Sequence, residues 1–288
     1  MKTAHQWFEE GLTLTRSGAR NEALDCFNNA IFLDQNDIDA HFNKGNMLFE
    51  LGKYELANKC FDHVISLNKT YMEAYRGKFK ALLALGKKQA TIECCEQAIL
   101  VDPNYKYAYN SKGNALRALG LNTKAIECYD KAISLDPSWA FPHNGKGNAL
   151  STLGKYSEAI ECYNKTIALD PNDTFPYNGK ANALFVMGRY DEAKECFDKV
   201  ISMNPLSALY FCNRGKFHLA RGEKAKAYTD FKKADDIIQS GHIDVDLSND
   251  NVQFIKSTLK TFTNEYVLEV QQAKQNPAEG DTEIEKED

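Results

Sequence analysis

The chain has 288 residues, 43% of them hydrophobic, and its 35 Lys and Arg residues nearly balance its 40 Asp and Glu residues. The totals therefore lack the strong basic excess of non-specific nucleic-acid binders, although a local basic patch is left open. No apolar run approaches the roughly 18 residues that a membrane helix needs, and none follows Lys2 as in a secretory signal. We therefore expect a cytoplasmic protein that is not inserted in a membrane.

Glycine recurs along the chain with a period of 34 residues. The positions are Gly18, Gly52, Gly86, Gly120, Gly154, Gly188 and Gly222. Glycine readily takes the positive φ that ends many helices, so we place each one in the turn between two helices. Self-similarity at a fixed period of this length indicates a repeat architecture.

Each turn is flanked by apolar residues at helical spacing. In the fourth block these are Tyr109, Gly113 and Leu116 before the turn, and Ala125, Tyr129 and Ala132 after it. Spacings of three and four residues put each set on one helix face, and the small residues let the two helices approach closely. Pro137 then ends the second helix of this block, because proline lacks the backbone donor and clashes with the preceding turn.

Six of the eight cysteines follow the same period. They are Cys26, Cys60, Cys94, Cys128, Cys162 and Cys196. Each therefore occupies the same place on the second helix of a different repeat. Stacked helices lie roughly 8–10 Å apart, whereas a disulfide needs Cα atoms within about 7 Å. We expect reduced, buried cysteines without a metal or redox role.

This pattern resembles the tetratricopeptide repeat family over roughly residues 4 to 241. The seven expected blocks are 4–37, 38–71, 72–105, 106–139, 140–173, 174–207 and 208–241. The resemblance implies an all-α, right-handed superhelical solenoid of stacked antiparallel helix pairs. No single repeat buries its apolar faces alone, so the copies are expected to stack on one another.

Two segments follow the repeats. Residues 249–275 carry apolar residues at helical spacing, including Val252, Ile255 and Leu259, and predict a C-terminal capping helix. Residues 278–288 hold six acidic residues against one lysine, which equals the net charge of −5 of the whole chain. This acidic tail has no apolar periodicity, and we expect it to be disordered.

The resemblance implies that the first helix of each repeat lines a concave groove. Two groove positions carry asparagine pairs in repeats 4 to 6: Asn110 and Asn114, Asn144 and Asn148, and Asn178 and Asn182. Side-chain amides donate and accept hydrogen bonds, so a ladder of them suits the backbone of an extended peptide. The alternative is that the second asparagine of each pair ties one repeat to the next.

Aromatic residues share the expected groove. Tyr107, Phe141 and Phe175 recur at one place near the start of the first helix, and we add Asn213 of repeat 7 to the candidate binding set. Exposed rings would bind hydrophobic side chains of a partner. Packing between repeats is the alternative.

Basic residues are also periodic, at Lys44, Lys78, Lys112, Lys146, Lys180 and Arg214. We expect their stems to pack on the helix while their charges reach water. The periodic residues Glu93, Glu127, Glu161 and Glu195 are candidates to neutralise them.

We find no Ser/His/Asp arrangement, phosphate-cradling glycine loop or metal-ligand spacing outside the repeat framework. The sequence thus predicts a non-enzymatic scaffold or adaptor without cofactor or metal, whose groove binds an extended peptide of another protein. Two alternatives stay open: a structural, self-associating protein, and a regulatory subunit whose acidic tail competes for the groove.

Overall fold

The structure is a computed structural model that describes residues 2–241 and 247–275, with side chains as far as Phe262 in the second range. These residues form 15 α-helices and no strand. They fall into two compact units, unit 1 (Met1–Pro171) and unit 2 (Asn172–Asp288), and each is described by itself. The expected acidic tail at 278–288 lies outside the described residues, and the handedness of a whole-chain superhelix stays a prediction.

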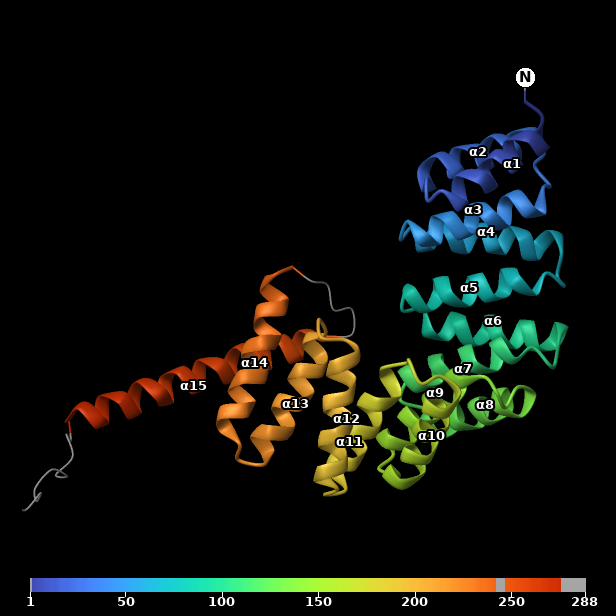
Figure 1. Cartoon of the computed structure of the whole chain (residues 1–288). Coiled ribbons are helices and arrows are strands. Elements are labelled where there is room, and N and C mark those ends of the chain that lie inside the picture. The colour runs from blue at the N-terminus through green and yellow to red at the C-terminus, as the bar shows by residue number, and fades with distance from the viewer. Residues whose placement is uncertain (1, 242–246, 276–288) are drawn as a thin grey trace, which may run out of the picture. The chain divides into compact units, whose positions relative to one another are not determined.

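Unit 1 consists of five helix pairs that follow one another along the chain, drawn from blue to green in Figure 1. Its helices are α1 (Ala4–Arg16), α2 (Arg20–Leu33), α3 (Ile38–Glu50), α4 (Tyr54–Leu67), α5 (Met72–Ala84), α6 (Lys88–Val101), α7 (Lys106–Ala118), α8 (Asn122–Leu135), α9 (Ala140–Thr152) and α10 (Tyr156–Leu169). Each helix packs against the next, and first helices of successive pairs also touch, as α7 touches α9. The first helices of successive pairs therefore share one side of the stack.

Unit 2 contains two further pairs and a long terminal helix. Its helices are α11 (Phe175–Val186), α12 (Tyr190–Met203), α13 (Ala208–Ala220), α14 (Lys224–Gln239) and α15 (Asn249–Gln275). In both units no described helix is long and apolar enough to cross a membrane.

The turn inside each pair is made by a glycine, as the period predicted. Gly52, between α3 and α4, has a φ of 72°, a conformation that residues with a Cβ adopt at a penalty. Its N–H donates to the carbonyl of Phe49 at 3.0 Å, and the next N–H, of Lys53, donates to Leu48 at 2.8 Å. These bonds satisfy carbonyls at the end of α3 and reverse the chain into α4.

In repeats 1, 2, 4, 5 and 7, one large ring of the second helix lies on a glycine of the first. Repeat 3 exchanges the sizes, with buried Phe79 on α5 and buried Cys95 on α6. A Cβ on Gly45 would come within 2.7 Å of the Phe61 ring, and one on Gly113 within 2.7 Å of Tyr129. Phe61 and Tyr129 are fully buried. The absence of a side chain on the first helix is therefore what makes room for the ring.

All eight cysteines are free. Burial raises the pKa of Cys94 to about 11, so its thiol is protonated at neutral pH and is not a nucleophile. Expected full burial was wrong for Cys128, Cys162 and Cys196, which are half-buried.

Helix α15 packs on the last repeat of unit 2. Ile255 is fully buried in a cluster with Phe231 and Ala234 of α14, and the ring of Phe254 meets that of Phe231 at 5.7 Å between centroids. Lys216 of α13 donates to Asn251 at 2.6 Å. The apolar side of α14 is thereby withdrawn from water.

Candidate functional site

Unit 1 has a cleft of about 450 Å³ along its first helices, which we call the inner cleft. Side chains of α3 and α5 supply most of its lining, among them Phe42, Asn46, Phe49, Glu73, Arg76 and Lys80. Spacings of three and four residues place Phe42, Asn46 and Phe49 on one face of α3. The same spacing places Glu73, Arg76 and Lys80 on one face of α5.

The inner cleft combines an apolar floor with charges that have no ionic partner. Phe42 packs on the buried ring of Phe61, with 6.0 Å between the ring centroids. No described carboxylate pairs with Arg76 or Lys80, and no described cation pairs with Glu73. The Arg76 guanidinium lies 5.2 Å from the centroid of the Tyr107 ring, within the range of a cation–π contact.

The periodic basic residues on the first helices are mostly neutralised. Their partners lie 16 residues earlier in the chain: Lys78 pairs with Asp62, Lys112 with Glu96, Lys146 with Asp130, and Arg214 with Asp198, at 2.5–2.7 Å. The prediction that other acids neutralise these cations was therefore wrong for these four ion pairs. The acids predicted were Glu93, Glu127, Glu161 and Glu195. The offset places the acid on the second helix of the preceding repeat, directly beside the cation. An acid 16 residues before the cation was the signal in the sequence.

The second asparagine of two ladder pairs is engaged inside its own repeat. The Tyr129 hydroxyl donates to Asn114 Oδ1 at 2.8 Å, and the Tyr163 hydroxyl donates to Asn148 Oδ1 at 2.8 Å. These hydrogen bonds join the two helices of one repeat. The alternative prediction, that the second asparagine links neighbouring repeats, is therefore wrong for these two bonds. In repeat 6 the residue equivalent to these tyrosines is Phe197, which has no hydroxyl for Asn182.

The first asparagine of each pair differs between the two units. In unit 1 the side-chain oxygens of Asn110 and Asn144 are buried and accept no hydrogen bond. In unit 2, Asn213 donates from Nδ2 to Asn178 Oδ1 at 3.0 Å. The residue at the corresponding offset from Asn110 is Gly145, where a Cβ would come within 2.6 Å of Tyr129. Asn213 therefore acts as a partner of Asn178.

The aromatic candidates differ in exposure. Tyr107 is half-buried against Trp139, with 4.9 Å between ring centroids, and Trp139 in turn lies 6.2 Å from Phe141. Phe141 is 68% exposed and Phe175 is 49% exposed. The structure thus brings Tyr107 and Phe141 into one aromatic row in unit 1. A ladder that continues from these residues to those of unit 2 stays a prediction.

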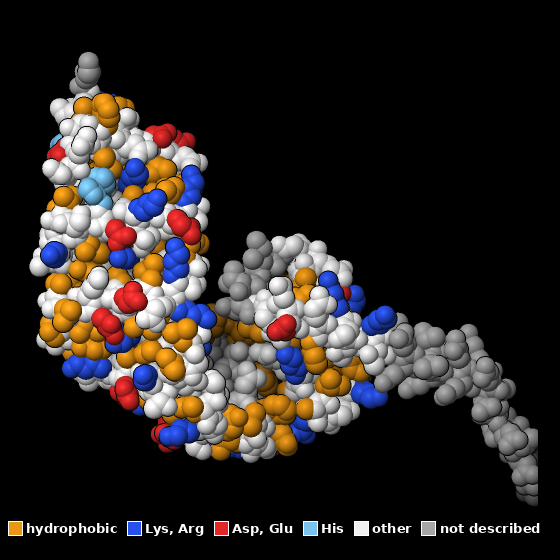
Figure 2. Space-filling view, turned by 180° about the vertical axis from the view of Figure 1, so that it is seen from behind, with side chains coloured by type: hydrophobic (Ala, Val, Ile, Leu, Met, Phe, Trp, Pro, Cys, Tyr) orange, Lys and Arg blue, Asp and Glu red, His pale blue; other side chains and the backbone are white. Residues whose placement is uncertain are grey.

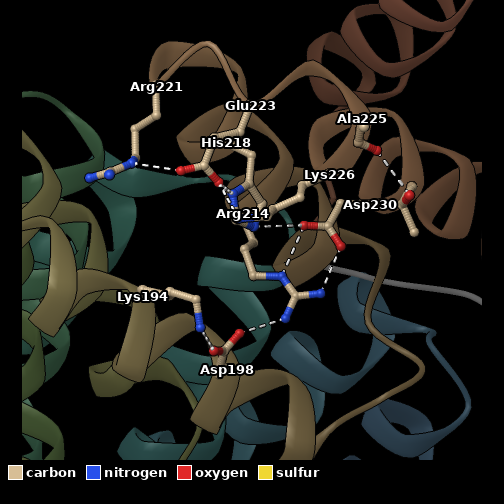
Figure 3. A network of polar contacts seen from close by, with 10 residues as sticks. Lys194, Asp198, Arg214, His218, Arg221, Glu223, Ala225, Lys226 and Asp230 are labelled. Carbon is tan, nitrogen blue, oxygen red and sulfur yellow. Dashed lines mark hydrogen bonds and ion pairs between the residues drawn. The ribbon is translucent and has the colours of Figure 1, made fainter.

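Unit 2 holds a polar network that joins α12, α13 and α14 (Figure 3). Arg214 donates two hydrogen bonds to the buried carboxylate of Asp230, at 2.9 and 2.7 Å, and a third to Asp198 at 2.6 Å. His218 Nδ1 lies 2.8 Å from Glu223. Hydrogen bonds from Lys226, Arg221 and His218 lower the pKa of Glu223 to about 2. The mutual satisfaction of these groups indicates a structural role.

Sequence and structure comparisons place these observations in a family. Models of the tetratricopeptide repeat match residues 38–71, 107–138, 140–173 and 176–205. No curated protein matches the sequence.

Several solved structures have a similar fold. A tetratricopeptide repeat protein from Parabacteroides merdae ATCC 43184 is 21% identical, with a TM-score of 0.71 over 89% of this chain and 97% of that one. MamA from Desulfovibrio magneticus RS-1 is 25% identical, with a TM-score of 0.54 over 59% and 96%. YrrB, described as having an unusual peptide-binding site, is 18% identical, with a TM-score of 0.51 over 62% and 91%. Together, the family models and the helix pairs described above show that the chain is a tetratricopeptide repeat protein.

Proposed function

We propose that the chain is a non-catalytic scaffold or adaptor whose inner cleft, along α3 and α5, binds an extended peptide segment of a partner protein. The observation that carries this proposal is that no described carboxylate pairs with Arg76 or Lys80. Four other cations on first helices each have a carboxylate partner, whereas these two face the cleft with none.

The lining of the inner cleft determines the kind of segment. Arg76 and Lys80 favour a carboxylate on the partner, and Arg presents the planar fork that suits one. Phe42 and Phe49 offer apolar contact a few residues away on α3. The ligand is therefore an extended segment with an acidic residue near a hydrophobic one. Glu73 selects against further acidic residues nearby, because like charges repel.

The half-buried residues Asn110 of α7 and Asn144 of α9 extend the same proposal along unit 1. Their side-chain oxygens are buried, so a peptide would meet their Nδ2 groups instead. Phe141 offers an exposed ring on α9. A longer peptide that continues past α5 would use the Nδ2 groups for its backbone and the ring for a side chain.

A peptide-library selection tests the proposal. Peptides are selected on the immobilised full chain, and fluorescence anisotropy then gives the affinity of the best one. Replacing both Arg76 and Lys80 by alanine is expected to weaken binding by at least about tenfold, because the charge-assisted hydrogen bonds from these side chains to the peptide carboxylate are lost. Phe49→Ala is expected to weaken it by several fold.

Lys59→Ala is the matched control, because Lys59 is an exposed lysine on the neighbouring helix α4 and does not line the inner cleft. It should leave both affinity and melting temperature unchanged. Selection of no peptide, or equal affinity of the double variant and the native chain, would contradict the proposal.

A further inference from the structure

A second hollow, of about 440 Å³, lies on unit 1 between α2, α3 and α4, and we call it the outer hollow. Its lining includes Asn28, Phe32, Gln35, His41, Lys44 and His63. His41 and Lys44 belong to α3 but lie on the other side of that helix from Phe42 and Asn46, because successive residues are about 100° apart. Figure 2 shows histidine side chains at the surface near the N-terminal end, with basic and hydrophobic side chains around them.

Lys44 lacks the carboxylate partner that four of its five counterparts have; the fifth, Lys180, also has an asparagine, Asn164, 16 residues earlier. In repeats 3, 4, 5 and 7 the equivalent cation pairs with an acid 16 residues earlier. The residue 16 positions before Lys44 is Asn28, an amide without charge. No described carboxylate pairs with Lys44, so its ammonium group faces the outer hollow with its charge uncompensated.

Two histidine rings lie next to this ammonium group. The rings of His41 and His63 are 4.3 Å apart between centroids. His41 Nε2 lies 3.0 Å from the carbonyl oxygen of Gln35, so this nitrogen donates. In repeat 4 the residue equivalent to His63 is Lys131, which lies over Tyr109 at 6.0 Å. Repeat 2 therefore has an imidazole where a later repeat has a lysine.

The lining of the outer hollow contains donors of hydrogen bonds and no carboxylate. The pKa of His41 is lowered, chiefly by burial and further by the nearby His63 and Lys44. The hydrogen bond to the Gln35 carbonyl and the charge of Asp37 oppose this shift. Among the residues that the structure describes, no group of three His, Cys, Asp or Glu is arranged to hold a metal ion. The surroundings are therefore suited to an anion.

We propose that the outer hollow binds a phosphate group carried on a side chain of a partner peptide. The Lys44 ammonium, the amides of Asn28 and Gln35 and the imidazole of His63 supply more donors than the two oxygens of a carboxylate use. Phe32, at the rim, is 81% exposed. This ring gives a peptide-borne phosphate an apolar contact that free phosphate lacks.

Calorimetric titration of the full chain tests this site with three probes. They are inorganic phosphate, a capped tripeptide with phosphoserine between two leucines, and the same tripeptide without phosphate. The phosphorylated tripeptide is expected to bind at least about tenfold more tightly than either other probe. The pKa of His41, followed by NMR, is expected to rise when it binds, because a nearby anion favours imidazolium.

Two substitutions on α2 make a matched pair. Asn28→Asp builds the ion pair that Lys78, Lys112, Lys146 and Arg214 have, and is expected to weaken binding of the phosphorylated tripeptide by about tenfold or more. Asn29→Asp adds the same charge one residue away on an exposed side of the helix, and is expected to change the affinity by less than about twofold. Phe32→Ala should weaken binding of the tripeptide but not of inorganic phosphate.

Equal binding of the phosphorylated and unphosphorylated tripeptides would overturn the proposal, as would equal effects of the two aspartate substitutions. Equal affinity for inorganic phosphate and the phosphorylated tripeptide would overturn the assignment to a peptide-borne group. The proposal does not depend on the inner cleft, so the Arg76 and Lys80 double variant should bind the phosphorylated tripeptide as the native chain does.

Discussion

Asparagines that look equivalent in the sequence have different roles at the residue scale. Asn114 accepts a hydrogen bond from the buried hydroxyl of Tyr129, whereas Asn182 has the ring of Phe197 at the corresponding place in its repeat. The side chain of Asn114 therefore holds two helices together. Asn182 has no such hydroxyl to bind, because Phe197 lacks one.

Asn114→Ala is expected to lower the free energy of unfolding by about 1–3 kcal/mol, because a buried hydroxyl loses its acceptor. Asn182→Ala is the matched control and should change it by less than about 0.5 kcal/mol. Urea denaturation of both variants measures the difference. Equal losses of unfolding free energy in the two variants would show that the hydrogen bond from Tyr129 to Asn114 does not stabilise the chain.

The Arg214 network permits a second comparison between two carboxylates on one guanidinium group. Asp230 is buried, whereas the side chain of Asp198 is 42% exposed. Asp230→Ala leaves Arg214 without its bidentate partner and is expected to destabilise the chain by about 3 kcal/mol. Asp198→Ala is expected to cost less than about 1 kcal/mol. Thermal unfolding followed by circular dichroism checks the order, and a larger effect at Asp198 would contradict this account of the network.

The residue scale also shows where sequence reasoning stops. The residue 15 positions after the second asparagine of each pair is either a tyrosine or a phenylalanine. Where it is a tyrosine, its hydroxyl donates a hydrogen bond to that asparagine. That signal is visible in the sequence once the contact is known. In contrast, the burial of the Asn110 side-chain oxygen without a hydrogen bond is a property of the packing around it, which the repeated pattern does not reveal.

At the scale of elements, helix boundaries follow from local chemistry. A glycine at positive φ recurs in the turn of every repeat, so a single pattern predicts each helix pair. Expected block starts at Ala4, Ile38 and Met72 coincide with the first residues of α1, α3 and α5. Helix α11 begins at Phe175, one residue after the expected start, with Pro176 in its first turn.

Helix α15 makes a testable contribution to unit 2. Ile255→Ala removes the fully buried side chain that α15 inserts beside Phe231 and Ala234, and is expected to lower the free energy of unfolding by about 2–5 kcal/mol. Ser257→Ala is an exposed control on the same helix and should change it by less than about 0.5 kcal/mol. Denaturant unfolding monitored by circular dichroism measures both, and an equally small effect of Ile255→Ala would contradict the capping role of α15.

At the scale of the whole molecule, the 34-residue period explains the helix pairs better than it explains the inner cleft and the outer hollow. Features shared by all repeats serve packing, so they stand out as a repeated pattern. The linings of the inner cleft and the outer hollow include departures from the pattern. Arg76 and Lys80 stand where repeats 4 to 6 have asparagine, and Asn28 stands where repeats 2, 3, 4 and 6 have an acid. The regular asparagines belong to repeats 4 to 6, whereas the inner cleft lies along α3 and α5 of repeats 2 and 3.

A crystal structure of the full chain bound to the best library-selected peptide tests the central claim most directly. The account predicts an extended peptide along the inner faces of α3 and α5, with a carboxylate within hydrogen-bonding distance of Arg76 or Lys80. A peptide bound solely to the second helices, with the inner cleft empty, would contradict it.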